Sequence, residues 1–80
     1  MLSSLKNTKP IVGIKQLRKA LTRGEITAVF LAENADPALT EPLEAMAKQA
    51  EIPVCRVATM KELGQACGIA VGAAAAGIRK

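Results

Sequence analysis

Short apolar runs alternate with amphipathic helical patterns along this 80-residue chain. Apolar residues recur at spacings of three and four over Ile14–Arg23, which predicts a helix that Gly24 ends. The apolar runs on either side, Ile11-Val12 and Thr27–Ala32, are too short for buried helices and predict strands. Residues 11–32 are therefore expected to form a strand, a helix and a strand.

The remaining sequence continues this alternation. Asp36 before Pro37 is a strong helix start, and this helix should continue through residue 50, with Pro42 distorting its first turns. A strand is expected at Pro53–Val57. It is followed by a short helix at Met60–Ala66, which Thr59 caps and Gly68 ends. The last apolar segment covers Val71–Ile78. The four alanines of that segment favour a helix by propensity but also suit a buried strand, so its state stays open.

Strands that alternate with helices predict an α/β layered fold. Eighty residues suffice for one small domain, and neither repeats nor a linker divide them. Its core must be aliphatic, because Phe30 is the only aromatic residue. Before Pro10, only a short helix is expected, since the residue preceding a proline avoids the helical region.

Positive charge is concentrated in the first 24 residues, which contain no acidic residue. They carry Lys6, Lys9, Lys15, Arg18, Lys19 and Arg23, whereas residues 25–80 carry five basic and seven acidic residues. A basic lobe on a faintly acidic domain is typical of proteins that bind a polyanion. The alternative is a solvated basic face without a partner.

Several classes of function find no support in the residues. The chain has no His, and Cys55 and Cys67 match no zinc spacing, so we expect two free thiols, no metal and no cofactor. A cysteine nucleophile would lack its usual base, and we expect no enzyme activity. No signal peptide is recognisable, and the apolar run over 66–78 is shorter than the roughly 20 residues that span a bilayer. A cytoplasmic, monomeric protein without membrane contact is expected.

The most informative segment is Gly13-Ile14-Lys15-Gln16-Leu17-Arg18-Lys19. A glycine at a strand-to-helix junction lets the backbone approach a phosphate, with the positive end of the helix dipole directed at it. Lys15 and Gln16 would extend past the helix tip and could donate to base edges such as guanine O6 and N7. Lys19, one turn later, could reach a phosphate, and Arg18 and Lys61 are possible additional phosphate contacts.

Residues Gly13 to Gly24 resemble the first-helix motif of the kink-turn-binding ribosomal proteins, the superfamily of the archaeal seven-Ae and eukaryotic thirty-e proteins. The resemblance continues in register through residues 32–37, Ile52-Pro53 and residues 63–75, and it is greatest to the short bacterial members of the YbxF type. It implies a three-layer α-β-α sandwich with a mixed four-stranded sheet, and a single RNA-binding domain over residues 1–80. Structured RNA that contains a kink-turn is the implied partner, and ribosome association is a further possibility.

In that family the tip of the first helix docks onto tandem sheared G·A pairs beside a sharp RNA bend, and an apolar loop holds an extruded nucleotide. By position, the resemblance assigns the first-helix contacts to Gly13, Lys15, Gln16 and Lys19, the acidic position before the second long helix to Asp36, and the loop to Ile69, Ala70 and Val71.

The sequence departs from the family pattern at three places. Lys15-Gln16 stands where archaeal and eukaryotic members usually have Asn-Glu. Met60 occupies the position of a common basic residue, with Lys61 next to it, and Ala70 replaces an acidic residue after the loop isoleucine. Ile69 and Val71 could instead be ordinary core residues.

Two other hypotheses stay open. One is an assembly module in which the Ala/Gly-rich C-terminal segment packs against another protein. The other is a small-molecule or enzyme domain on the same α/β scaffold. The lack of aromatics argues against single-strand stacking platforms, which need aromatic faces for the bases, but not against docking to a kink-turn.

Overall fold

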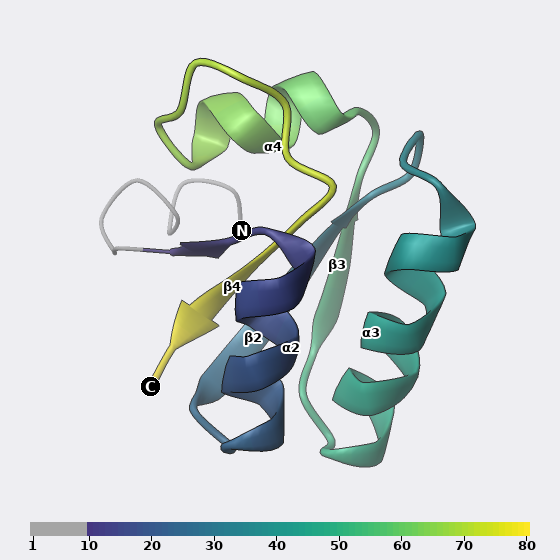
Figure 1. Ribbon diagram of the computed structural model, residues 1–80, viewed down its shortest axis with the longest axis vertical. Helices are drawn as coiled ribbons and strands as arrows, with labels where there is room; N and C mark the ends of the chain where they lie inside the picture. The colour runs from purple at the N-terminus through teal and green to yellow at the C-terminus, as the bar shows by residue number, and fades with distance from the viewer. Residues whose placement is uncertain (1–9) are drawn as a thin grey trace.

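The computed structural model describes residues 10–80, which form four strands and three helices (Figure 1). With the labels of Figure 1, the elements in chain order are β1 (Ile11–Val12), α2 (Ile14–Thr22), β2 (Ile26–Ala32), α3 (Pro37–Gln49), β3 (Val54–Val57), α4 (Met60–Ala66) and β4 (Ala75–Arg79). The short helix expected before Pro10 lies outside the described residues, as do Lys6 and Lys9.

The four strands form one mixed sheet in the order β1-β4-β2-β3. β2 is parallel to β3 and antiparallel to β4, and β4 is in turn antiparallel to β1. The central position of β2 follows from its sequence, because Val29, Phe30 and Leu31 in succession place apolar side chains on both faces of the sheet.

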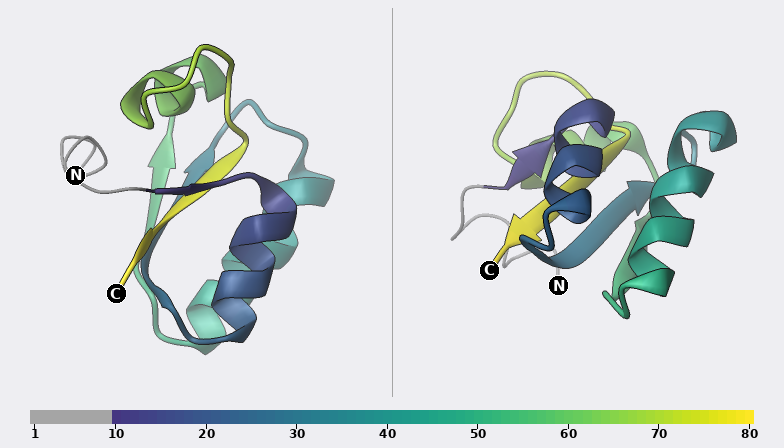
Figure 2. Two further views of the ribbon diagram at one scale, coloured as in Figure 1. Left: turned by 60° about the vertical axis from the view of Figure 1, so that its left-hand side comes forward. Right: turned by 60° about the horizontal axis from the view of Figure 1, so that its bottom comes forward.

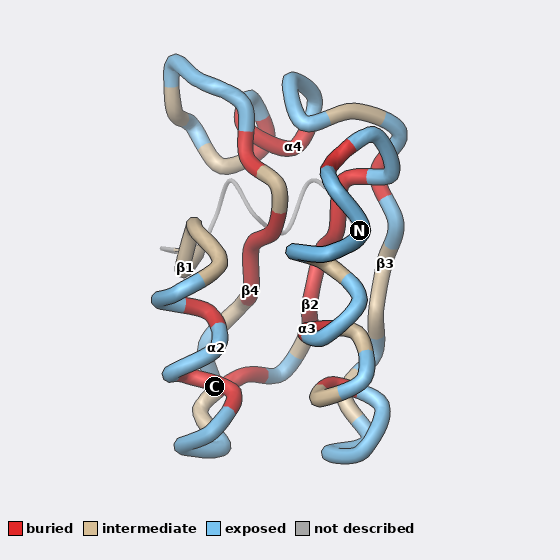
Figure 3. The backbone as a smooth tube through the Cα atoms, turned by 45° about the vertical axis from the view of Figure 1, so that its right-hand side comes forward, coloured by how far each residue is buried: buried red, intermediate tan, exposed pale blue. Residues whose placement is uncertain are grey.

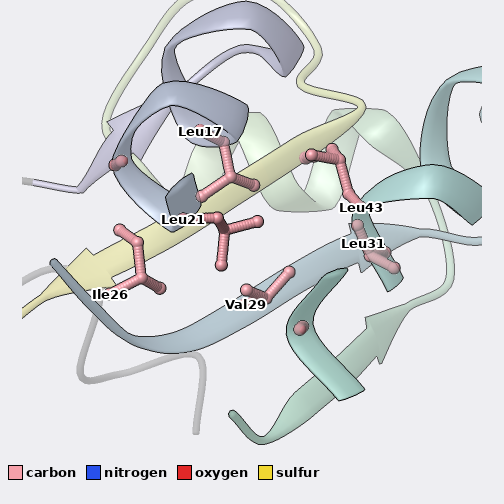
Figure 4. Close-up of a cluster of buried hydrophobic side chains, with 9 residues drawn as sticks. Leu17, Leu21, Ile26, Val29, Leu31 and Leu43 are labelled. Carbon is pink, nitrogen blue, oxygen red and sulfur yellow. The ribbon is translucent and has the colours of Figure 1, made fainter. Parts of the chain in front are cut away.

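Different helices cover the two faces, which makes a three-layer α-β-α sandwich (Figures 1 and 2). α2 and α3 lie on one face, where a core cluster joins Leu17 and Leu21 to Val29, Leu31 and Leu43 (Figure 4). α4 lies on the other face, where Leu63 packs with Phe30 and Val57. The predicted fold class is confirmed.

The helix boundaries agree with the prediction to within a residue at nearly every end. α2 ends at Thr22, one residue before the predicted end, and Gly24, with φ of 70°, closes it. The Asp36 carboxylate accepts a hydrogen bond from the N–H of Ala38 at 2.9 Å and caps α3. The expected distortion at Pro42 does not break α3, which runs through this proline without interruption.

The last apolar segment, whose state was open, is a loop followed by a strand. β4 extends from Ala75 to Arg79, so the strand begins four residues after the start of the apolar run at Val71. The loop over residues 67–74 connects α4 to β4 and is exposed at residue 68 and at residues 70–72 (Figure 3). Within residues 10–80, no helix has the length and apolar character needed to cross a membrane.

Candidate nucleic-acid interface

The start of α2 and the loop over residues 67–74 meet at one end of the sheet. The N–H of Gly13 donates to the carbonyl of Ala75 at 3.2 Å, which joins the residue before α2 to the first residue after the loop. Beside them, the N–H of Ala32 donates to the carbonyl of Ala74 at 2.9 Å. The two segments predicted to contact RNA, separated by more than fifty residues in sequence, are therefore neighbours in space (Figure 1).

The start of α2 is free of side-chain capping. Gly13 occupies the N-cap position with φ of 109°, a conformation that L-residues rarely adopt, and a Cβ there would lie 2.8 Å from Oε1 of Gln16. No side chain caps α2, and its first turn has no acidic residue. α3 and α4 differ, because the side chains of Asp36 and Thr59 cap them. The first N–H groups of α2 thus keep their hydrogen-bonding capacity for an anion.

The exposed face of α2 carries the predicted polar contacts. Leu17, Ala20 and Leu21 are buried against the sheet and fix the orientation of the helix. The opposite face exposes Lys15, Gln16, Arg18 and Lys19. Lys19 follows Lys15 by four residues, so the two ammonium groups lie on the same side of the helix, one turn apart.

Asp36 has a structural role in this protein. It is exposed, but its carboxylate is engaged with the first turn of α3 through the bond to Ala38. An RNA contact by Asp36 stays a prediction.

The loop after α4 is held against its helix by backbone contacts. The N–H of Ile69 donates to the carbonyl of Gly64, and the N–H of Ala73 donates to the carbonyl of Met60, at 3.1 and 3.0 Å. Gly64 lies so close to this loop that a Cβ on it would collide with the carbonyl oxygen of Val71. Gly68 ends α4 with φ of 78° and turns the chain into the loop, as predicted.

The three predicted loop residues have different environments. Ile69 is half-buried and packs against the core cluster of Phe30 and Leu63. Ala70 is exposed, and the side chain of Val71 is among the large exposed apolar groups, with 70% of its surface accessible. Core packing therefore accounts for Ile69 but not for Val71.

Asn34 has a role that the sequence analysis missed. Its Oδ1 accepts a hydrogen bond from the N–H of Met60 at 2.8 Å and links the turn after β2 to the start of α4. Met60 itself is 36% exposed beside Gly72, and Lys61 is exposed on the same helix. An asparagine in a turn is a recognisable signal for such a bond, but its partner is 26 residues away and has no sequence signature.

Cys55 and Cys67 are free, partly buried thiols, and burial raises the pKa of the Cys67 thiol. Among residues 10–80 there is no group of three side chains placed to hold a metal ion.

A mixed sheet between two helical layers, with an uncapped basic helix end beside an exposed apolar loop, defines a small α-β-α sandwich domain with its candidate site at one end of the sheet. The chain belongs to the ribosomal protein L7Ae/L30e/S12e/Gadd45 family, whose model matches residues 2–80.

Individual relatives cover most of the chain. The RNA-binding protein YbxF of Geobacillus stearothermophilus is 49% identical over 70 residues, which are 88% of this chain and 85% of the relative. The RNA-binding protein BH0128 of Halalkalibacterium halodurans is 44% identical over 73 residues, which are 91% of this chain and 89% of the relative. The solved structure of the Giardia lamblia 15.5kD RNA binding protein superposes with a TM-score of 0.84 at 26% identity, covering 99% of this chain and 65% of that one.

Proposed function

We propose that residues 1–80 act as a single RNA-binding domain that recognises kink-turns in structured RNA. The observation that carries the proposal is the hydrogen bond from the N–H of Gly13, at the uncapped tip of α2, to the carbonyl of Ala75, which directly follows the loop that carries the exposed Val71. A polar donor surface beside an apolar one suits a bent RNA, which presents phosphates and base edges next to an unstacked nucleotide.

The tip of α2 supplies the polar half of this recognition. In A-form RNA the major groove is too deep and narrow for side chains, whereas sheared G·A pairs beside a bend expose base edges. Lys15 and Gln16, both exposed at the tip, donate to guanine O6 and N7 there. Gly13, which has no side chain, lets a phosphate approach closely, and the free N–H groups of the first turn donate to its oxygens. Lys19 neutralises another phosphate.

The loop supplies the apolar half. Val71 exposes an aliphatic side chain at a site where the backbone is fixed by Gly64 and Met60. An extruded nucleotide that packs on Val71 and Ala70 removes apolar surface from water without base-specific hydrogen bonds. We therefore expect this subsite to accept any of the four bases.

The relatives support a binding function rather than a catalytic one. YbxF and the Giardia protein are both named as RNA-binding proteins. We infer the same class of partner for this chain, with association with the ribosome as one setting in which such an RNA occurs. We expect it to act as a monomer in the cytoplasm.

An assembly function through the C-terminal segment has less structural support. Ala73, Ala75 and Ala76 are buried in this chain's own core, with at most 5% of their surface exposed. Ala70, Val71 and Gly72 of the Ala/Gly-rich segment are exposed, and the first two of these are among the residues assigned to RNA.

A binding assay with two RNAs tests the proposal. One RNA is a kink-turn hairpin, and the other differs only by replacing its tandem G·A pairs with Watson–Crick pairs. We expect at least about fivefold tighter binding to the kink-turn, since loss of one base contact costs about 1–3 kcal/mol. Equal affinities would contradict the proposal, and concentration-dependent self-association without RNA binding would favour the assembly function.

A further inference from the structure

Met60 is the methionine that the described fold leaves open to solvent. The chain has three methionines, of which Met1 lies outside the described residues. Met46 is half-buried and packs against the core cluster beneath α2 and α3. Met60, the first residue of α4, keeps 36% of its surface accessible. A dissolved oxidant therefore reaches the thioether of Met60 more readily than that of Met46.

The backbone of Met60 is held from two sides, directly beside the loop. Its N–H donates to Oδ1 of Asn34 at 2.8 Å, and its carbonyl accepts from the N–H of Ala73 at 3.0 Å. The loop turns back along α4 (Figure 1), and a Cβ on Gly72 would lie 3.1 Å from the Cβ of Met60. The side chain of Met60 thus begins next to the residue that follows Val71. A chemical change at this side chain takes place beside the apolar part of the candidate interface.

Oxidation would make this side chain polar. A lone pair on the thioether sulfur attacks one oxygen of a peroxide, the O–O bond breaks, and the second oxygen leaves as water after proton transfer. The sulfur loses two electrons, which the peroxide takes up. The product, methionine sulfoxide, carries a strongly polar S–O group, and methionine sulfoxide reductases convert it back to the thioether.

We propose that Met60 is a modification site at which oxidation by a peroxide lowers RNA binding reversibly. This inference rests on the proposed function, because it takes an extruded nucleotide to lie on Val71 and Ala70. In the free protein, water hydrates the sulfoxide oxygen, and the fold is retained. In the complex, the nucleotide excludes this water and leaves the oxygen without a hydrogen-bond partner, which is unfavourable for a polar group.

The two thiols can be separated from Met60 by pH. Cys55 and Cys67 are both partly buried, and burial raises the pKa of the Cys67 thiol. A thiol reacts with a peroxide as its thiolate, which becomes scarce at about pH 5. The thioether carries no proton and stays as reactive as before. Treatment at this pH therefore directs oxidation to the methionines.

Peroxide treatment of matched proteins tests the proposal. The wild type and Met60→Leu are treated with hydrogen peroxide at about pH 5, and peptide mass mapping locates the added oxygen. Met60→Leu retains Met1 and Met46, and each protein is compared with its own untreated sample. Affinity is measured for a kink-turn hairpin, for its Watson–Crick variant, and for a kink-turn with an abasic extruded nucleotide.

We expect Met60 to be oxidised before Met46. The oxidised wild type should bind the kink-turn at least about fivefold more weakly, a factor at the lower end of the penalty for an unpaired buried polar group. On the abasic RNA no base covers the sulfoxide, so oxidation should leave the affinity unchanged. Treated Met60→Leu should bind like its untreated sample. Sulfoxide reductases for both sulfur epimers should restore the wild-type affinity, and thermal unfolding should be the same before and after oxidation.

The outcomes separate this inference from the proposed function. If the untreated wild type prefers the kink-turn over its Watson–Crick variant but oxidation of Met60 leaves its affinity unchanged, the modification site is overturned and the proposed function stands. An equal loss on the abasic RNA, an equal loss in treated Met60→Leu, or a lowered Tm also overturns it, because the effect would then come from the fold or from another methionine. If the untreated wild type shows no preference, the kink-turn assignment fails, and control of it by Met60 fails with it.

Discussion

The side-chain oxygen of Asn34 accepts a hydrogen bond from the backbone N–H of Met60, at 2.8 Å. This bond connects the turn after β2 with the start of α4, and the carbonyl of Met60 in turn accepts from the N–H of Ala73 in the loop. Asn34 thus helps to position the loop that carries Val71, although it lies 37 residues before it in the sequence.

Replacing Asn34 tests this connection. Asn34→Ala removes the acceptor and should lower the free energy of unfolding by about 0.5–1.5 kcal/mol. For a domain of this size, 1 kcal/mol corresponds to a Tm decrease of about 4–8 °C. Asn34→Asp retains an oxygen acceptor and is the matched control, with a smaller loss. Equal losses for the two variants in thermal unfolding would show that the hydrogen bond contributes little.

A second prediction concerns the close contact between Gly64 and the loop. Alanine in place of a helical glycine ordinarily stabilises by up to about 1 kcal/mol. Here the added Cβ would collide with the carbonyl oxygen of Val71, a backbone atom that moves only if the loop moves. We expect Gly64→Ala to destabilise the fold by about 1–3 kcal/mol and to weaken RNA binding by the folded protein.

Gln65→Ala provides the control for that experiment, since Gln65 is the exposed neighbour on the same helix. Chemical denaturation and RNA affinity are measured for both variants. A Gly64→Ala protein that is as stable as the wild type would mean that the loop yields easily and is not a fixed surface.

A third prediction separates base contacts from phosphate contacts on α2. Lys19→Ala should weaken binding to kink-turn and plain duplex alike and reduce the salt slope by roughly one. Lys15→Ala or Gln16→Ala should cost about 1–3 kcal/mol more on the kink-turn than on duplex, because a base contact is lost. Titrations of both RNAs distinguish these cases, and equal losses on the two would restrict Lys15 and Gln16 to phosphate contacts.

The sequence predicted the elements whose residues interact locally. The spacing of Leu17 and Leu21 defines α2, and the caps of α3 and α4 depend on Asp36 and Thr59, which bond to N–H groups within three residues. These interactions are encoded in short segments and need no tertiary information. The exposure of Lys15, Gln16 and Lys19 follows from the same helical periodicity.

The start of β4 was not predictable from local sequence. Alanine suits a helix, a strand or a loop, so the run from Ala73 to Ala76 contains no boundary signal. The boundary depends on the pairing of Ala75 with Leu31 and on the absence of a side chain at Gly77, where a Cβ would meet the side chain of Leu17. Both are contacts between residues far apart in the chain. The exposure of Val71 depends likewise on the packing of its loop against Gly64.

The last prediction compares two apolar residues of the same loop. Val71 is 70% exposed, so Val71→Ser should change the free energy of unfolding by less than about 0.5 kcal/mol. Ile69 is half-buried against the core cluster, so Ile69→Ser should destabilise the fold by about 1–3 kcal/mol. Thermal unfolding of the two variants measures this difference.

RNA binding by the same pair then tests the role of the loop. If Val71 packs on an extruded nucleotide, Val71→Ser should weaken kink-turn binding while the protein stays fully folded, because the serine hydroxyl replaces apolar surface that the nucleotide would cover. The loss should be the same for all four bases at the extruded position, since no base-specific hydrogen bond is involved. Ile69→Ser should weaken binding mainly through its effect on the folded fraction. Wild-type affinity of a folded Val71→Ser protein would remove this residue from the RNA interface and leave recognition to the tip of α2.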